Sequence, residues 1–165
     1  MSHSFRLAQQ ADLPSIVEIY NSTIASRKVT ADTEPQTVTS RQAWFEQHQN
    51  PKRPLYVLEQ TGEVIAWLSF SDFYGRPAYQ HSAEISLYLA ESQRGKGLGG
   101  KLLIEAESLA QALGIEILLA FIFSHNTPSL TLFEKLEYQR WGQLPNVARM
   151  DGQDFSLTIL GKTLT

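Results

Sequence analysis

The sequence predicts an α/β domain built on a mixed central sheet with helices on its faces. Short apolar runs of strand length alternate with segments whose apolar residues recur at helical spacing. A glycine-dense turn in the middle of the chain joins one such run to one such segment. The chain has 165 residues, of which 42% are hydrophobic and 19% charged, as in ordinary domains with a sizeable core. We therefore expect residues 1–165 to form a single domain.

The N-terminal part predicts one strand and two helices. Ser4–Leu7 is expected to form a short strand. Asp12 is placed to cap the next helix, with Pro14 in its first turn. The apolar residues of this helix recur on one face: Leu13, Ile16, Val17, Ile19 and Tyr20. The polar segment Ser26–Val38 predicts a loop, and Ser40 is expected to cap the second helix.

Three strands follow in the middle of the chain. Leu55–Glu59 and Val64–Phe70 flank a Thr-Gly pair at residues 61 and 62, which predicts a hairpin. Ser71–Gln80 contains glycine and proline and predicts a loop. Ala83–Leu89 is the next strand.

The C-terminal half alternates helices with strands. Apolar residues recur at helical spacing from Leu98 to Leu113, and Gly114 stands where a helix should end. Thr127 is expected to cap a further helix, with Pro128 at its first position. The remaining strands are Ile117–Phe123, Tyr138–Gln143 and Phe155–Leu160. The expected order is β-α-α-β-β-β-α-β-α-β-β.

The turn Gln93–Gly100 predicts an anion site. It joins a strand directly to a helix, and the free N–H groups at a helix start attract negative charge. Its glycines let the backbone approach a phosphate closely, and Arg94 and Lys96 add positive charge. We expect this turn to bind a phosphate or pyrophosphate group.

Two ligand templates fit these glycines. Gly95, Gly97 and Gly100 match G-x-G-x-x-G, the dinucleotide fingerprint, which needs an acidic residue at the end of the next strand. That strand ends in Phe123 and carries no carboxylate there. The same turn contains R-x-x-G-x-G, from Arg94 to Gly99. This pattern resembles the pyrophosphate loop of the GCN5-related N-acetyltransferases (GNAT), so we favour acetyl-CoA over a nicotinamide cofactor.

The resemblance covers nearly the whole chain and is closest to the phosphinothricin and methionine sulfoximine N-acetyltransferases. The segments that carry it include Asp12–Asn21, Arg76–Tyr79, Ala83–Leu89 and Asn126–Leu136. It implies a GNAT fold in which the two central strands splay apart to form an acetyl-CoA cleft. The resemblance also implies a set of cofactor-binding residues: Leu87, Tyr88, Leu89, Arg94, Gly95, Lys96, Gly97, Leu98, Gly99 and Asn126. For Asn126, a purely structural role at a helix start is an equal alternative.

Glu84 is the candidate general base. A carboxylate in an apolar strand is seldom there for packing, and burial would raise its pKa toward a useful range. Glu84 also matches the base proposed for this family. The competing interpretation is an exposed charge at the strand edge, or one paired with Arg76.

The loop around residues 73–79 is the candidate acceptor site. If the substrate is a free amino acid, its carboxylate needs a cation, and Arg76 can bind it with two hydrogen bonds. Phe73 and Tyr79 would shape the pocket, and Ser86 would donate a hydrogen bond to the substrate. The competing interpretation of Arg76 is an exposed loop charge.

One position departs from the family. Relatives carry a tyrosine or histidine where this chain has Phe133, and phenylalanine cannot protonate a leaving thiolate. The proton would then come from water, Ser129 or another residue, or the thiolate would leave unprotonated. His125 lies nearby, although a structural role fits it better.

Composition limits the partners. The net charge of −3 and the pI of about 5.8 argue against nucleic acid or an anionic membrane. The chain has no cysteine, its histidines lack metal-ligand spacing, and no apolar run is long enough to span a membrane. We expect a cytoplasmic protein without a metal that acts on a small amine. The resemblance leaves a homodimer open.

Three other functions remain to be weighed against the amino-acid acetyltransferase. The same fold could acetylate a polyamine, an aminoglycoside or a protein N-terminus, but Arg76 in the acceptor loop favours an anionic acceptor. A non-catalytic acyl-CoA sensor agrees with Phe133, whereas Glu84 argues against it. A nicotinamide-dependent enzyme ranks third.

Overall fold

The computed structural model describes residues 4–165, and within them seven strands form one sheet in the order β1-β2-β3-β4-β5-β7-β6. All neighbouring strands are antiparallel except β4 and β5, which are parallel, so the sheet is mixed as predicted. The strands are β1 (Phe5–Leu7), β2 (Leu55–Gln60), β3 (Glu63–Asp72), β4 (Ser82–Leu89), β5 (Ile117–Phe123), β6 (Gln139–Met150) and β7 (Gln153–Thr163). The α-helices are α1 (Leu13–Asn21), α2 (Val38–Gln47), α3 (Leu98–Ala112) and α4 (Thr127–Lys135).

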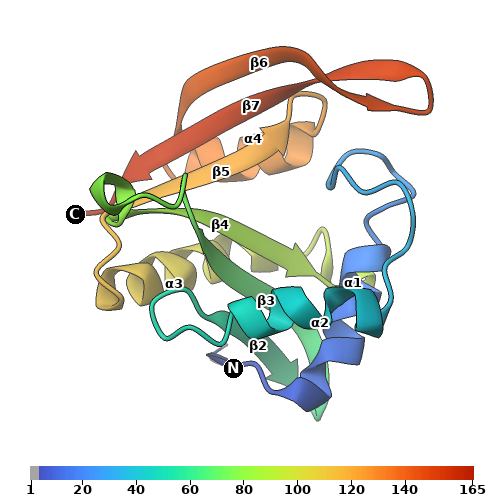
Figure 1. Cartoon of the computed structure of the whole chain (residues 1–165), viewed down its shortest axis with the longest axis vertical. Coiled ribbons are helices and arrows are strands. Elements are labelled where there is room, and N and C mark those ends of the chain that lie inside the picture. Colours follow the sequence, from blue (N-terminus) through green and yellow to red (C-terminus); the bar gives the residue numbers. More distant parts are fainter. Residues whose placement is uncertain (1–3) are drawn as a thin grey trace.

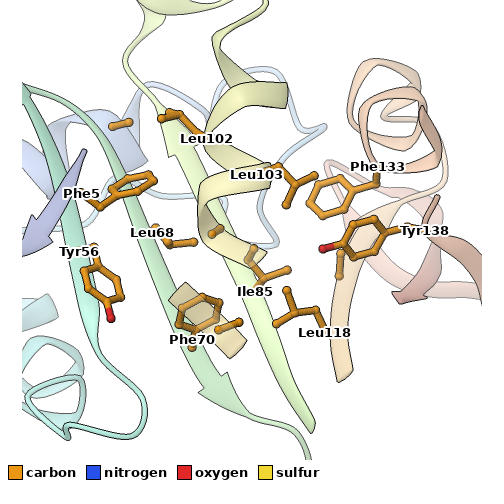
Figure 2. Close-up of a cluster of buried hydrophobic side chains, with 14 of the residues drawn as sticks. Phe5, Tyr56, Leu68, Phe70, Ile85, Leu102, Leu103, Leu118, Phe133 and Tyr138 are labelled. Atoms are coloured by element: carbon orange, nitrogen blue, oxygen red, sulfur yellow. The ribbon is translucent and has the colours of Figure 1, made fainter. Parts of the chain in front are cut away.

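Helices lie on both faces of the sheet (Figure 1), and each face has its own apolar core. Helices α1 and α2 pack on one face, where Leu13, Ile16 and Trp67 are almost completely buried. Helices α3 and α4 cover the other face, and Figure 2 shows how Leu102 and Leu103 of α3 meet side chains from several strands. Burial of both faces explains why β5 reads as a continuous apolar run. Among residues 4–165, no helix has the length and apolar character that crossing a membrane requires.

Two helix starts differ from the predictions by one to three residues, and a third helix lacks the predicted cap bond. Helix α2 begins at Val38, because Thr37 and Ser40 form a capping box in which Ser40 is the third helical residue. Asn126 rather than Thr127 caps α4, and its side chain accepts a hydrogen bond from the Ser129 N–H. The Asp12 carboxylate precedes α1 but makes no cap bond to it.

The sequence predicted the β2–β3 hairpin correctly but not the full length of the β6–β7 hairpin. Thr61 and Gly62 have φ angles of 50° and 81° and join β2 to β3, which confirms the predicted hairpin. The β6–β7 hairpin is much longer than expected and turns at Asp151 and Gly152, with φ angles of 52° and 77°. Its strand β6 is largely exposed and contains two register shifts, so its sequence has little strand character.

The central strands diverge after a short parallel contact. β4 pairs with β5 only from Ser82 to Glu84, opposite Ile117 to Leu119. Beyond Glu84 the two strands separate, although β4 continues to Leu89 and stays paired with β3 on its other edge. The fold class predicted from the sequence, with its splayed central strands, is confirmed.

The Asp12 carboxylate holds the start of the chain to α1. It accepts hydrogen bonds from Arg6 Nη1 at 2.8 Å, Arg6 Nη2 at 3.0 Å and the Gln9 N–H at 2.7 Å. The Arg6 guanidinium lowers the pKa of Asp12 below its ordinary value. A carboxyl pKa that is lower in the folded state stabilises the fold above the unfolded pKa, and this stabilisation is lost as pH falls through the folded pKa.

Asp12→Asn is therefore expected to lower the free energy of unfolding at neutral pH by about 1–2 kcal/mol. The effect is no larger because Arg6 is partly exposed, so solvent screens its attraction to Asp12. Urea denaturation at pH 7 and near pH 2.5 would measure it, and the difference from the unchanged protein should shrink at the lower pH. Glu134→Gln, which removes the exposed pair with Arg140, is the control and should change stability little. An equal loss of unfolding free energy at both pH values would contradict stabilisation by the ionised Asp12 carboxylate.

Candidate active site

A cleft of about 490 Å³ opens where β4 and β5 separate. Its walls come from β4, β5, α4, the loop between α1 and α2, and the β6–β7 hairpin. The lining residues are Val29, Thr30, Ala31, Glu84, Ile85, Ser86, Leu87, Tyr88, Ala120, Phe121, Ile122, Phe123, Asn126, Ser129, Phe133, Val147, Ala148 and Leu157. Across the described residues 4–165, Glu84 is the one charged side chain in this lining.

Glu84 stands at the point where the strands part. It is the last residue of β4 that pairs with β5, and its position alternates along β4 with buried apolar residues such as Ala83 and Ile85. Burial raises its carboxyl pKa above the ordinary value. Arg76 lines a different cavity, so the interpretation of Glu84 as its ion-pair partner is not supported. Glu84 is thus a partly desolvated carboxylate that faces a cleft.

The edge of β4 that faces the cleft can receive an extended ligand. No described strand pairs with this edge beyond Glu84. Leu87 and Tyr88 line the cleft, whereas Leu89 packs against the core. The Tyr88 ring stacks on Trp67 with centroids 4.4 Å apart, so its side chain belongs to the packing and its backbone is what the ligand could use.

The glycine-dense turn follows β4 after a short 3-10 helix, Glu91–Gln93, and leads into α3. Gly95 and Gly97 have φ angles of 74° and 76°, in the left-handed region that favours glycine. A Cβ at either position would meet nothing within 4 Å, so the backbone conformation rather than crowding requires glycine there. Arg94, Gly95, Lys96 and Gly97 are exposed, which leaves the turn open to a phosphate.

Other residues in the turn and at the start of α3 hold the turn against the rest of the fold. The Arg94 guanidinium folds back and donates hydrogen bonds to the Leu89 carbonyl and to Ser22 Oγ. Leu98 is buried in the core. A Cβ at Gly99 would lie 3.2 Å from Leu132 Cδ2, so this glycine allows close packing of α3 against α4. The turn thus offers backbone N–H groups held in place by its own side chains.

Helix α4 supplies the wall opposite β4. Asn126 is buried, lines the cleft and also caps the helix, so the structural role that we considered for it is present. Ser129 and Phe133 lie one turn apart and line the same cleft. The Phe133 ring packs edge-on against Tyr138 with centroids 4.9 Å apart. Ser129 is therefore the hydroxyl that α4 presents to the cleft.

The predicted acceptor residues are divided between two cavities. Ser86 lines the cleft with Glu84. Phe73, Arg76 and Tyr79 instead line a second cavity of about 560 Å³ beside the β3–β4 loop. The two are adjacent, because the Phe73 ring stacks at 6.4 Å against Phe121, a cleft residue.

Two parts of the cleft were not predicted. Val29, Thr30 and Ala31 come from a segment that the sequence analysis treated only as a loop. Val147 and Ala148 come from the half of β6 that was not predicted. No local pattern marks these residues, because contacts with distant parts of the chain bring them to the cleft.

Comparisons with known proteins agree with this architecture. Residues 16–138 match the model of the Acetyltransferase (GNAT) family. YwnH of Bacillus subtilis, whose assignment as a phosphinothricin acetyltransferase is provisional, is 55% identical over 98% of this chain and 99% of its own. The L-methionine sulfoximine/L-methionine sulfone acetyltransferase of Pseudomonas aeruginosa strain PAO1 is 34% identical over 97% of this chain and 94% of its own.

A solved structure shows the same fold with a ligand. The phosphinothricin acetyltransferase of Sinorhizobium meliloti in complex with acetyl-CoA superposes with a TM-score of 0.90. It is 28% identical, and the match covers 99% of this chain and 89% of the other. The family model spans β4, the glycine-dense turn, β5 and α4, and this chain belongs to the GNAT family of acetyltransferases.

Proposed function

We propose that this enzyme transfers the acetyl group of acetyl-CoA directly to the amino group of a small amino-acid-like acceptor, of the phosphinothricin or methionine sulfoximine type. The observation that supports it most is the position of Glu84 in the cleft, at the point where β4 and β5 separate. The same strand β4 leads from Glu84 toward the glycine-dense turn. The relatives named above act on such compounds or bind acetyl-CoA, which supports both the donor and the acceptor.

The chain has a suitable place for the pyrophosphate, the pantetheine arm and the thioester of the donor. Acetyl-CoA supplies an acetyl thioester whose sulfur leaves as a thiolate. The N–H groups of the turn at Gly95–Gly97 and the start of α3 would bind the pyrophosphate. The open edge of β4 at Leu87, Tyr88 and Leu89 would pair with the extended pantetheine arm. A backbone N–H of Leu87 or Tyr88 would polarise the thioester carbonyl.

Glu84 would remove the proton from the attacking amine, directly or through water. Amines are mostly protonated at neutral pH, so the nucleophile must lose a proton before or during attack. The raised pKa of Glu84 brings its basicity closer to what general-base catalysis needs. The neutral, largely apolar lining around it would keep that pKa raised.

Ser129 would donate a hydrogen bond to the leaving sulfur. Phe133 occupies the cleft position at which relatives present a proton donor, and it has none. The Ser129 hydroxyl lies one turn earlier on the same helix and lines the same cleft. A hydroxyl can stabilise a thiolate by hydrogen bonding without fully transferring its proton, and water can protonate the product thiolate afterwards.

Arg76 would bind the acceptor carboxylate. The cleft lining in the described residues contains no cation, whereas Arg76 lies in the adjacent loop, beyond the Phe73–Phe121 contact. Closure of this loop, or the same loop from the second copy in a homodimer, would bring the guanidinium to the acceptor. Its planar donors match a carboxylate.

Arg76→Ala is expected to raise the KM for an amino-acid acceptor by about 10- to 100-fold, since a charged bidentate contact contributes roughly 1.5–3 kcal/mol. Steady-state kinetics with methionine sulfoximine and with its decarboxylated amine would measure this, and the second KM should hardly change. Lys52→Ala, in the same second cavity, is the matched control. Equal effects of Arg76→Ala on both acceptors would contradict carboxylate binding.

The proposed function is tested by thiol release from acetyl-CoA with a panel of amines. The panel contains phosphinothricin, methionine sulfoximine, ordinary amino acids, spermidine and an aminoglycoside. Turnover confined to the amino-acid compounds is the expected result. Turnover with spermidine or the aminoglycoside would overturn the acceptor class, although the donor site would stand. If acetyl-CoA binds but no amine is acetylated, the result would favour an acyl-CoA sensor, which agrees with the lack of a proton donor at Phe133.

A further inference from the structure

Arg27 ties together two walls of the cleft. It lies in the loop between α1 and α2, and its Nε donates a hydrogen bond to Asp151 Oδ2 at 2.8 Å. Asp151 forms the turn of the β6–β7 hairpin, 124 residues further along the chain. In Figure 1 the loop after α1 rises toward the tip of this hairpin, which agrees with the contact. The ion pair therefore joins the loop that carries Val29–Ala31 to the hairpin that carries Val147 and Ala148.

Arg27 also fixes the shape of its own loop. Its Nη1 donates to the carbonyls of Ile24 at 3.0 Å and Thr33 at 3.2 Å, on both sides of the cleft-lining residues. Its backbone φ of 58° lies in the left-handed region, which a non-glycine residue seldom occupies without support. Its carbonyl oxygen accepts a hydrogen bond from His125 Nε2 at 2.7 Å, and His125 follows β5.

The other end of the loop is attached to α1. The Tyr20 hydroxyl forms hydrogen bonds with Thr30 and Asp32. The Asn21 side chain donates to the Gln36 carbonyl and accepts from the Gln36 N–H, both at 2.8 Å. Tyr20 and Asn21, at the end of α1, thus serve as anchors for the loop. The loop spans from α1 to the β5 and β6–β7 side of the cleft.

We propose that Arg27 is a positioning residue that holds Val29, Thr30 and Ala31 as a wall of the cleft that also contains Glu84 and Ser86, with Asp151 and His125 as its partners. The inference rests on the proposed function for the assignment of the acceptor amine to this cleft. Without the Arg27 side chain the loop would keep its attachment to α1 and the His125 hydrogen bond to its backbone, but it would lose the ion pair with the hairpin and the bonds to the Ile24 and Thr33 carbonyls. The wall would then sample open positions, and the acceptor would bind less tightly before transfer.

The effect should be local. Arg27 and Asp151 have side-chain exposures of 27% and 64%, and partly exposed ion pairs contribute little to global stability. The same hairpin contains a second ion pair, in which the Arg149 guanidinium donates hydrogen bonds to Asp154, the shorter at 2.6 Å. This pair provides a matched control for charge removal on the same element.

The first test is amide hydrogen exchange of the full chain without any ligand. In Arg27→Ala and Asp151→Ala we expect residues 28–33 to exchange about tenfold faster, with Tm within a few degrees of the unchanged protein. Arg149→Ala should leave these residues unchanged. Exchange at residues 28–33 that is the same in all variants would overturn the proposal, whatever the enzyme proves to acetylate.

The second test separates positioning from a general structural effect. Arg27→Ala should raise the acceptor KM about tenfold while kcat and the acetyl-CoA KM stay within about twofold. His125→Ala should act in the same direction, and His125→Gln, which keeps a donor near the position of Nε2, should recover most of the loss. Equal falls in all kinetic parameters, or no recovery by glutamine, would contradict the role. If exchange changes as expected but no amine is acetylated, the proposed function fails while the positioning of the loop stands.

Discussion

Glu84→Gln is expected to lower kcat by about 10²- to 10⁴-fold near neutral pH, the range that general acid–base groups supply. Glutamine has nearly the same shape and keeps the hydrogen-bonding oxygen, but it cannot accept the proton of the amine. The position at the fork of β4 and β5 should keep its geometry, so the KM for acetyl-CoA should change little. Rates measured from pH 6 to 10 would show the loss shrinking as the acceptor amine deprotonates in solution.

The same substitution should make the fold more stable. Burial raises the pKa of Glu84, which means that the folded state disfavours the charged carboxylate relative to the unfolded state. This destabilises the fold at pH values above the folded pKa and has no effect below the unfolded pKa. Glu84→Gln is thus expected to raise Tm at pH 7 but not near pH 3.5.

Glu116→Gln, an exposed carboxylate just before β5, is the control and should change neither activity nor Tm. An active Glu84→Gln enzyme with a pH profile like that of the unchanged protein would exclude Glu84 as the base. The acyl-CoA sensor would instead be favoured by two results together. The Glu84→Gln variant would bind acetyl-CoA normally, and the unchanged protein would acetylate no amine.

Gly97→Val is expected to weaken acetyl-CoA binding by about 100-fold. Gly97 has a φ of 76° at the N-terminal cap of α3, and a β-branched residue is strongly disfavoured there. The turn would have to change its backbone path, which would move the N–H groups that we expect to bind the pyrophosphate. Isothermal titration calorimetry with CoA would give the change in Kd.

Gly62→Val provides a matched control. Gly62 has a φ of 81° in the β2–β3 turn, and a Cβ there also meets nothing within 4 Å, so the backbone strain is similar. This variant should lose stability but keep the Kd for CoA. If both valine variants weakened CoA binding equally, the effect would come from general destabilisation and not from the turn before α3.

The sequence predicts well those features that depend on local chemistry. The turn from Arg94 to Gly99 and the hairpin at Thr61 and Gly62 rest on glycines whose φ angles no other residue readily adopts, and the structure has both. The apolar runs of β3 and β5 follow from burial on both faces. Helix starts were displaced by one to a few residues because several capping side chains stand close together, as at Asn126 and Thr127.

The prediction was weaker where distant contacts decide the structure. Strand β6 contains Gly142 and Pro145, is mostly exposed, and shifts register twice, so neither alternation nor apolar character marks it. The Asp-Gly pair at residues 151 and 152 was a usable signal for its turn. The cleft wall formed by Val29–Ala31 has no such signal, since Arg27 reaches its partner only in the folded chain.

The most direct test of the proposed reaction follows the acetyl group itself. Acetyl-CoA carrying a ¹³C-labelled acetyl group is incubated with the enzyme and methionine sulfoximine, and both small molecules and protein are examined by mass spectrometry. Direct transfer predicts the label on the α-amino nitrogen of the product, one free CoA per acetylated acceptor, and no label on the protein at any time. Label on the enzyme before the acceptor is added, or label that never leaves CoA, would contradict a direct acetyl transfer at the fork of β4 and β5.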